Sequence, residues 1–256
     1  MRRVAPLILA GLLAACASAP TADPAVVRVT DDFEAYAVGA QPTGPWSVAT
    51  SNGEAVIDDT RAASGRRSLK IHLTERGGVL LTLRGGPLFP AGQDHLSGRM
   101  KVWLEAGPTD NVHWTLIEAG GRRRSDGRQA MVRFGGQHPI PGLGSRLMSN
   151  YDSPEYYATP PGPGSDCWAH AGDTDVMPEG RWVQVDWTIG QEGLRLSLDG
   201  RAIHGLDVRD RGQGCLWAPA DYPWEIPVME RVSIGWESYQ TDGPRTLWID
   251  DVEVRN

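Results

Sequence analysis

Hydrophobic and polar residues alternate with a period of two in many short segments of this 256-residue chain. That period places successive side chains on opposite faces of a β-strand, so each segment predicts a strand with one buried face. The 31 Gly and 19 Pro residues punctuate these segments, and no segment shows a convincing amphipathic helical pattern. The strands are expected near residues 69–73, 78–84, 100–104, 111–118, 129–135, 183–189, 194–198, 229–236 and 246–254.

The order of these segments predicts an all-β fold. Leu194–Leu198 leads into Asp199-Gly200 and then Arg201–Ile203, which is typical of a strand, a tight turn and a second strand. Because no crossover helix separates the strands, they are expected to be antiparallel, in a two-sheet β-sandwich or jelly roll. The sequence has no internal repeat, which argues against a propeller or a solenoid.

The N-terminus resembles a bacterial lipoprotein export signal. Arg2 and Arg3 precede a short apolar run, residues 4–13, which is too short to span a bilayer. Leu13-Ala14-Ala15-Cys16 follows and resembles the cleavage box of such signals. The resemblance implies removal of residues 1–15 and lipidation of Cys16.

The signal also predicts the domain order and the location. Residues 16–28 are small and Pro-containing and are expected to form a flexible tether, followed by a single domain at 29–256. Ala17 stands where an Asp would retain such proteins at the inner membrane, so the resemblance implies that the lipid holds this protein at the outer membrane of the cell envelope. We expect the protein to be a monomer. The formal net charge of −7 argues against nucleic acid as a partner.

Two further cysteines remain, Cys167 and Cys215. An exported protein meets an oxidising compartment, so these two are expected to form a disulfide. They lie in stretches that break the strand rhythm, 136–175 and 210–227, and the bond would join two long loops. Long loops in a compact domain are usually functional or mobile.

Four motifs carry a resemblance to a family. They are Asp31-Asp32-Phe33-Glu34, Ser64-Gly65 before Ser68-Leu69-Lys70, His113-Trp114-Thr115, and Trp248-Ile249-Asp250-Asp251-Val252. Together they resemble the core domain of the fungal cellulose-induced secreted proteins and their bacterial relatives. That family is similar to glucuronan and alginate lyases with a concanavalin A-like jelly roll. The resemblance therefore implies a carbohydrate-active domain and a polysaccharide partner that contains uronic acids.

The same resemblance implies a structural calcium ion where the first and last strands meet. Calcium prefers hard oxygen ligands. Carried over to this sequence, Glu34 and Asp250 would supply carboxylates and Ser64 a loop oxygen, whereas Asp251 should lie on the opposite strand face.

Cleavage of a uronate glycan by β-elimination needs a group that neutralises the sugar carboxylate, a base and an acid. Asn111-Val112-His113 is similar in spacing to the Gln-x-His of alginate-lyase-like enzymes, with Asn in place of Gln. We therefore expect His113 as base, with Asn111, Arg133 and Gln137 around the carboxylate. Tyr151 is the expected acid, and Tyr156 and Tyr157 are alternatives.

Ten tryptophans can either fill a sandwich core or stack on sugar rings. Trp182 and Trp187 lie on opposite faces of one strand, so at most one of them belongs to the core. Trp168, Trp217 and Trp224 lie in expected loops and are the candidates for stacking on a ligand. His138 is a further substrate-binding candidate.

Three functions remain open at this point. The first is an envelope-anchored polysaccharide lyase, the second a carbohydrate-binding lipoprotein without activity, and the third a structural envelope protein. The sequence contains no Gly-x-Ser-x-Gly, His-Glu-x-x-His, phosphate-loop or Cys-x-x-Cys motif that would indicate another chemistry.

Overall fold

A computed structural model describes residues 26–153 and 165–256, which consist of β-strands, connecting segments and one short 3-10 helix, Gly86–Leu88. The strands are β1 (Arg28–Asp31), β2 (Ser47–Asp58), β3 (Ser68–Arg84), β4 (Leu96–Leu104), β5 (Trp114–Arg122), β6 (Gln129–Ile140), β7 (Gly144–Asp152), β8 (Asp166–His170), β9 (Val176–Met177), β10 (Trp182–Gly190), β11 (Gly193–Leu198), β12 (Arg201–Ala202), β13 (Gly214–Leu216), β14 (Val228–Ser238) and β15 (Arg245–Arg255). Their paired registers are antiparallel, which confirms the predicted fold class.

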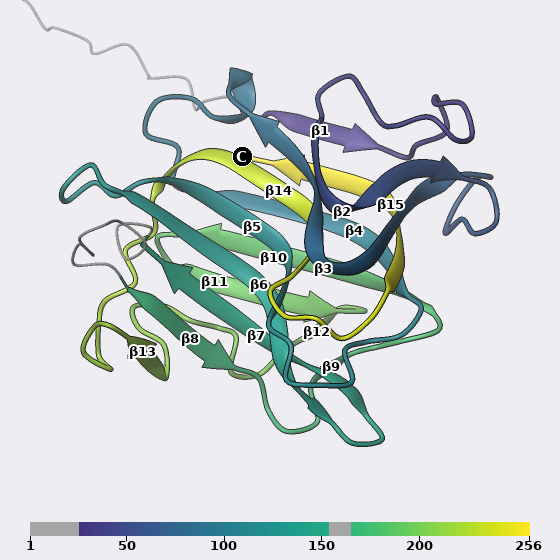
Figure 1. The fold of residues 1–256 in the computed structure, drawn as a ribbon. Coiled ribbons are helices and arrows are strands. Elements are labelled where there is room, and N and C mark those ends of the chain that lie inside the picture. The colour runs from purple at the N-terminus through teal and green to yellow at the C-terminus, as the bar shows by residue number, and fades with distance from the viewer. Residues whose placement is uncertain (1–25, 154–164) are drawn as a thin grey trace, which may run out of the picture.

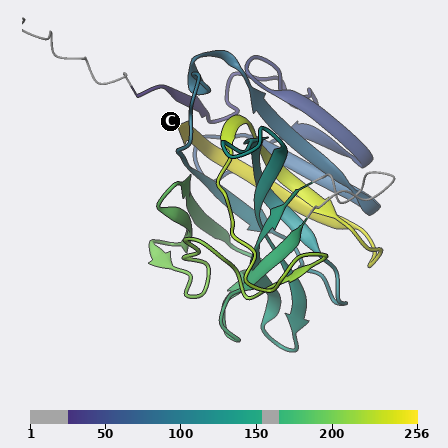
Figure 2. The same cartoon turned by 90° about the vertical axis from the view of Figure 1, so that its left-hand side faces the viewer.

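The long strand β3 connects the two expected sheets into one curled sheet (Figure 1). Its first part, Leu69–Leu73, pairs with β15, and its second part, Gly77–Arg84, pairs with β14. The path continues from β15 through β4, β10, β11 and β12, and from β14 through β5, β6, β7, β8 and β13. Figure 2 shows these two halves from the side.

The hydrophobic core lies between the two halves. Ile117 and Ala119 face it from β5, and Val183 and Val185 face it from β10, all of them fully buried. Each pair is two residues apart, so alternation turns the intervening side chains away from the core. Trp187 is also buried there, where a Cβ at Gly98 would overlap its ring, and Trp182 lies on the other face of β10, as predicted.

Several strand boundaries differ from the prediction. The segments at 69–73 and 78–84 belong to one strand, and β5 begins only at Trp114, after His113. The two expected long loops contain β7, β8 and β13, because polar side chains on an outer sheet face weaken the period-two pattern there.

Residues 1–25, including the expected signal and Cys16, lie outside the described residues, as do Tyr156 and Tyr157. In the part of the chain that is described, no helix has the length and apolar character needed to cross a membrane.

Candidate functional site

Polar side chains form a row across four neighbouring strands on the side of the β14-to-β13 half that faces away from the core. We call this side the front face. In register, Glu118 of β5 lies beside Arg133 of β6, then Asn150 of β7 and Trp168 of β8. Their sequence neighbours Ala119, Val132 and Tyr151 are fully buried on the core side, so alternation determines that the polar row points outward.

Arg133 is held by two buried carboxylates. Its Nε lies 3.0 Å from Glu118 Oε2, and its Nη1 is in contact with the carboxylate of Asp152. Arg231 approaches the other oxygen of Glu118 at 3.1 Å. Burial raises the pKa of Glu118, but Arg133 and Arg231 outweigh it and hold that pKa below its usual value. The charge of Arg133 is therefore compensated within the protein.

His113 lies beside this charged group, immediately before β5. Its Nε2 is 3.2 Å from Asn150 Oδ1, and its backbone N–H donates to Gln240 Oε1 at 2.6 Å. Burial, together with the nearby positive charge of Arg133, lowers the pKa of His113 to about 4. The imidazole is thus neutral near pH 7. In the tautomer whose Nε2–H donates to Asn150, Nδ1 carries a lone pair that can accept a proton.

Tyr239 packs against His113 and was not identified from the sequence. The two ring centroids are 4.8 Å apart, and the guanidinium of Arg133 lies 5.9 Å from the tyrosine ring. The Tyr239 hydroxyl donates to Glu237 Oε2 at 2.9 Å, and burial raises its pKa. Tyr239 follows the end of β14 and has no alternating context, so only the tertiary structure places it here.

A cavity of about 390 Å³ opens beside this group on the front face. Its lining comes from β6, β7, β8 and β13 and from two loop positions: His113, Gln137, His138, Met148, Asn150, Asp166, Trp168, His170, Leu216 and Gln240. An indole, several amides and three imidazoles suit a polar ligand that also presents a flat apolar face, such as a sugar ring.

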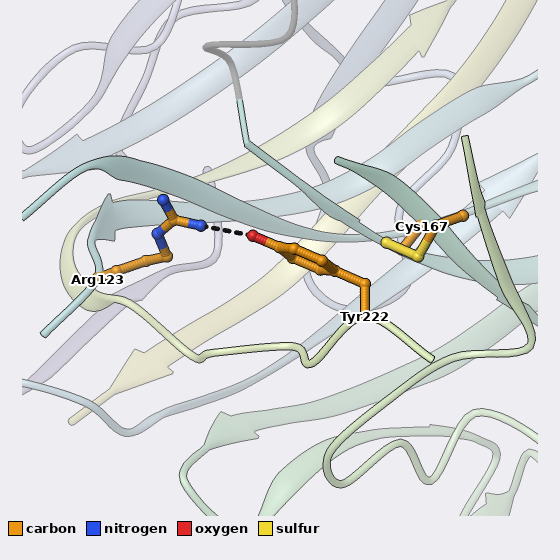
Figure 3. The surroundings of a disulfide bond; sticks show 4 residues. Arg123, Cys167 and Tyr222 are labelled. Carbon is orange, nitrogen blue, oxygen red and sulfur yellow. Dashed lines mark hydrogen bonds between the residues drawn. A yellow bond between two sulfur atoms is a disulfide. The ribbon is translucent and has the colours of Figure 1, made fainter. Parts of the chain in front are cut away.

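The predicted disulfide between Cys167 and Cys215 is present (Figure 3), on the core side of the strands that carry one wall of this cavity. The two cysteines lie opposite each other in β8 and β13. Their sequence neighbours Asp166, Trp168 and Leu216 line the cavity. The bond therefore fixes the two strands from which these three side chains project.

A hydrogen bond between Arg123 and Tyr222 also holds the loop after β13 near the disulfide. Arg123 Nη1 donates to the Tyr222 hydroxyl at 2.9 Å, as Figure 3 shows, and its Nη2 donates to Asp126 Oδ2 at 2.6 Å. Arg123 is thus engaged in structural contacts at the turn between β5 and β6.

Two expected site residues lie on the wrong face of the sheet. Tyr151 is fully buried on the core side, where it stacks on Trp224 with ring centroids 5.9 Å apart. Trp224 is itself only 4% exposed. The predicted roles of Tyr151 as acid and Trp224 as a stacking residue are therefore wrong, because alternation turns Tyr151 to the side opposite Asn150.

Two of the three residues expected around the sugar carboxylate are also placed elsewhere. Asn111 is exposed in the segment before β5 and does not line the cavity, because that segment is not a strand. Arg133 is bound by Glu118 and Asp152 and does not line the cavity either. Gln137 and His138 do line it. Trp217 follows Leu216 at the rim and is 67% exposed.

Two residues of the expected calcium site, Glu34 and Asp250, contact the loop 63–67, which contains the third, Ser64. Asp250 Oδ2 accepts the backbone N–H groups of Ala63 and Ser64 at 2.7 and 3.2 Å. Glu34 Oε1 accepts those of Arg66 and Arg67, both at 2.6 Å. Burial raises the pKa of Asp250 to about 6, even though its hydrogen bonds from backbone N–H groups act to lower it.

The two carboxylates are hard ligands of the kind that calcium prefers, but their contacts with the loop are backbone N–H groups, and the Ser64 hydroxyl donates to Asp251 Oδ1 at 2.7 Å. Among the described residues, no group of three or more His, Cys, Asp or Glu side chains is arranged to hold a metal ion. A calcium ion at Glu34, Ser64 and Asp250 would therefore depend on carbonyl or hydroxyl oxygens as well.

A curled antiparallel β-fold, with an indole and amide groups lining a cavity on an outer sheet face, is typical of carbohydrate-active jelly-roll domains. The chain belongs to the polysaccharide lyase-like family described as the Cip1-like core domain, whose model matches residues 32–256. This confirms the resemblance drawn from the motifs.

The solved structure of one similar protein supports the fold. The structure of the cellulose-induced protein Cip1 is similar with a TM-score of 0.57 and 20% identity, covering 88% of this chain and 96% of that one. The structure of alginate lyase AlyC3 is similar with a TM-score of 0.45 and 10% identity, covering 73% of this chain and 74% of that one. A search of curated protein sequences finds no match.

Proposed function

We propose that this protein cleaves uronic-acid-containing glycans by β-elimination in the front-face cavity. The observation that carries the proposal is the neutral, buried His113, hydrogen-bonded to Asn150 at the cavity of a polysaccharide lyase-like domain. A general base must be unprotonated at the working pH and within hydrogen-bond reach of the proton that it removes.

In the proposed reaction, His113 removes the proton at C5 of the uronate. The electron pair of that C–H bond forms the C4=C5 double bond, and the C4–O glycosidic bond breaks. The imidazolium returns the proton to the departing oxygen when both groups lie on the same side of the sugar ring. The amides of Asn150 and Gln137 are suited to hold the sugar carboxylate, because each can donate hydrogen bonds into the cavity.

The remaining front-face groups would act by positioning. Tyr239 packs on the His113 ring, and Arg133 supports the low pKa of His113 by its charge. Trp168 offers an indole for a sugar ring at the cavity wall.

The test is to incubate the purified protein with glucuronan, alginate and pectate and to follow the ultraviolet absorbance of the unsaturated uronate. We expect absorbance to rise with at least one glycan, and the His113→Gln variant to lose at least about a hundredfold in rate, as for removal of a general base. His204→Gln, on an exposed turn, is the matched control. Equal rates for wild type and His113→Gln would contradict the mechanism.

The pH dependence gives a second check. A base must be neutral to act, and the pKa of His113 is about 4. We therefore expect kcat to stay level from pH 7 to about 5 and to fall to half near pH 4, as His113 in the complex becomes protonated. A fall centred near pH 6.5, the usual pKa of histidine, would show that another group is the base.

A carbohydrate-binding protein without activity is the second candidate. It is favoured by the ion pairs of Arg133, which engage a charge that a lyase could use on the substrate carboxylate. Retardation in a glycan affinity gel with no rise in absorbance would support it. If the protein causes no rise in absorbance and is not retarded by any glycan, a structural envelope protein is the remaining candidate.

We also propose that a calcium ion is bound by Glu34, Ser64 and Asp250. The buried carboxylate of Asp250, with its raised pKa, would be stabilised in its charged form by a cation. Calcium is expected to raise the melting temperature of wild type at pH 7.5 but not that of Asp250→Ala, with Asp207→Ala as an exposed control. A wild type that does not respond to calcium or chelator would contradict the site.

Finally, we propose that the domain is anchored in the cell envelope through a lipid on Cys16, at the outer membrane. The lipobox-like Leu13-Ala14-Ala15-Cys16 supports this. Wild type should partition into detergent and Cys16→Ser should not. Equal partitioning of both proteins would contradict the anchor.

A further inference from the structure

Two histidines line the front-face cavity but take no part in the proposed elimination. His138 of β6 and His170 of β8 have ring centroids 5.4 Å apart, with their planes inclined by 44°. Both rings belong to the lining of the cavity that contains His113.

The position of His138 depends on an irregular stretch of β6. Pairing between β6 and β7 shifts register between Gly136 and Pro139, and His138 within this bulge has φ of 60°. Left-handed backbone is uncommon for residues other than glycine, and bulges near functional sites redirect a side chain. Here the bulge in β6 places the exposed imidazole of His138 beside the ring of His170 in β8, with β7 between the two strands.

The side chain of Gln213 fixes the backbone of His170 through two hydrogen bonds. Its N–H donates to Gln213 Oε1 and its carbonyl accepts from Gln213 Nε2, each at 3.0 Å. Its ring Nε2 is buried and has no hydrogen-bond partner among the described residues. A buried polar atom without a partner is unfavourable, so a ligand atom that forms a hydrogen bond with this ring would be stabilised.

Among the described residues, no Lys or Arg side chain lines the cavity, so the positive charge for an anionic ligand would have to come from the histidines themselves. Asp166 and His113 are the other titratable groups of the cavity lining, and the nearby Arg146 is paired with Asp173. Burial, then the proximity of His138 and Arg146, lowers the pKa of His170, so its ring is neutral near pH 7. An anion placed against it would favour the protonated form.

We propose that the His138–His170 pair is a second carboxylate subsite, which binds the uronate next to the one that is cleaved and takes up a proton as it does so. This inference rests on the proposed function, because it assumes a chain of uronates in the cavity. The two histidines would recognise the anionic substrate, and substrate affinity would rise as the pH falls.

The test is calorimetric binding of saturated trisaccharides from glucuronan, alginate and pectate at pH 5.5 and 7.5, with the neutral mannotriose as reference. We expect at least one uronate trisaccharide to bind more tightly at pH 5.5, by up to about tenfold per pH unit, with proton uptake shown by buffers of different ionisation enthalpy. Mannotriose should show no such dependence.

Two variants assign the effect to the pair. His138→Asn keeps a residue that tolerates left-handed backbone, and His170→Gln keeps a neutral polar side chain. Each should remove the pH dependence and the proton uptake, whereas His204→Gln should keep both. Unchanged melting temperatures would show that the variants fold.

The outcomes separate the subsite from the proposed function. Proton-linked binding that depends on His138 and His170, without any cleavage, would leave the subsite in place and contradict the lyase. Cleavage with the same pH-dependent binding in both variants would overturn the subsite, as would the absence of binding by all three uronate trisaccharides.

Discussion

The two outer faces of the sheet carry very different side chains. On the back face, which is the outer side of β15, β4 and β10, Trp248, Trp103 and Trp182 lie side by side in register. The Arg61 guanidinium lies 4.4 Å from the Trp103 ring and 4.7 Å from the Trp248 ring. On the front face, the corresponding places hold Glu118, Arg133 and Asn150 beside a cavity.

The difference shows how one strand pattern serves two purposes. On the back face, cation–π contacts cover the indoles with a side chain of the same chain, and Trp248 is only 4% exposed. On the front face, the buried charges of Glu118, Arg133 and Asp152 are paired with one another, as buried charges must be. The neighbouring side chains of Asn150 and Trp168 line the cavity. The alternation is common to both faces, and the side chains that each face presents differ: indoles beside an arginine on the back face, ion pairs beside a cavity on the front face.

The largest effect is expected from breaking the front-face ion pairs. Arg133→Met would leave the buried carboxylates of Glu118 and Asp152 without this partner and should lower the free energy of unfolding by about 3–5 kcal/mol. Urea denaturation measures it. Arg195→Met, from the half-exposed pair with Asp207, is the control and should change little. Similar losses for both would mean that the front-face pairs have no special role.

The disulfide should rank next. The double variant Cys167→Ser, Cys215→Ser opens a loop of sequence separation 48 and should lose about 2–4 kcal/mol. Because β8 and β13 carry Asp166, Trp168 and Leu216, ligand affinity should fall as well, whereas the back face should be unaffected. Full ligand affinity in the double variant would show that β8 and β13 hold Asp166, Trp168 and Leu216 in place without the disulfide.

The smallest effect is expected on the back face. Arg61→Gln removes the cation from two indoles and should lower stability by about 1 kcal/mol, with no change in glycan binding or cleavage. Arg209→Gln, an exposed arginine, is the control for loss of charge. A loss of glycan binding in Arg61→Gln would show that the back face also takes part in recognition.

The sequence predicted the all-β class and the disulfide partners, and four of its candidate site residues line the front-face cavity: His113, Gln137, His138 and Trp168. Alternation is a local property, so it reports which residues share a face without reference to the rest of the fold. It even contained the information that Tyr151 lies opposite Asn150, but the sequence pattern alone did not show that Tyr151 belongs to a strand.

The tertiary structure decided which face of each strand meets the core and which distant groups meet on the front face. Tyr239 reaches His113, and Glu118 and Asp152 neutralise Arg133, through pairings between strands far apart in the sequence. His170 became a neighbour of His138 only because β8 follows β7 in the sheet and a bulge in β6 turns His138 toward it. Register and bulges arise from long-range hydrogen bonding, and a local pattern cannot specify them.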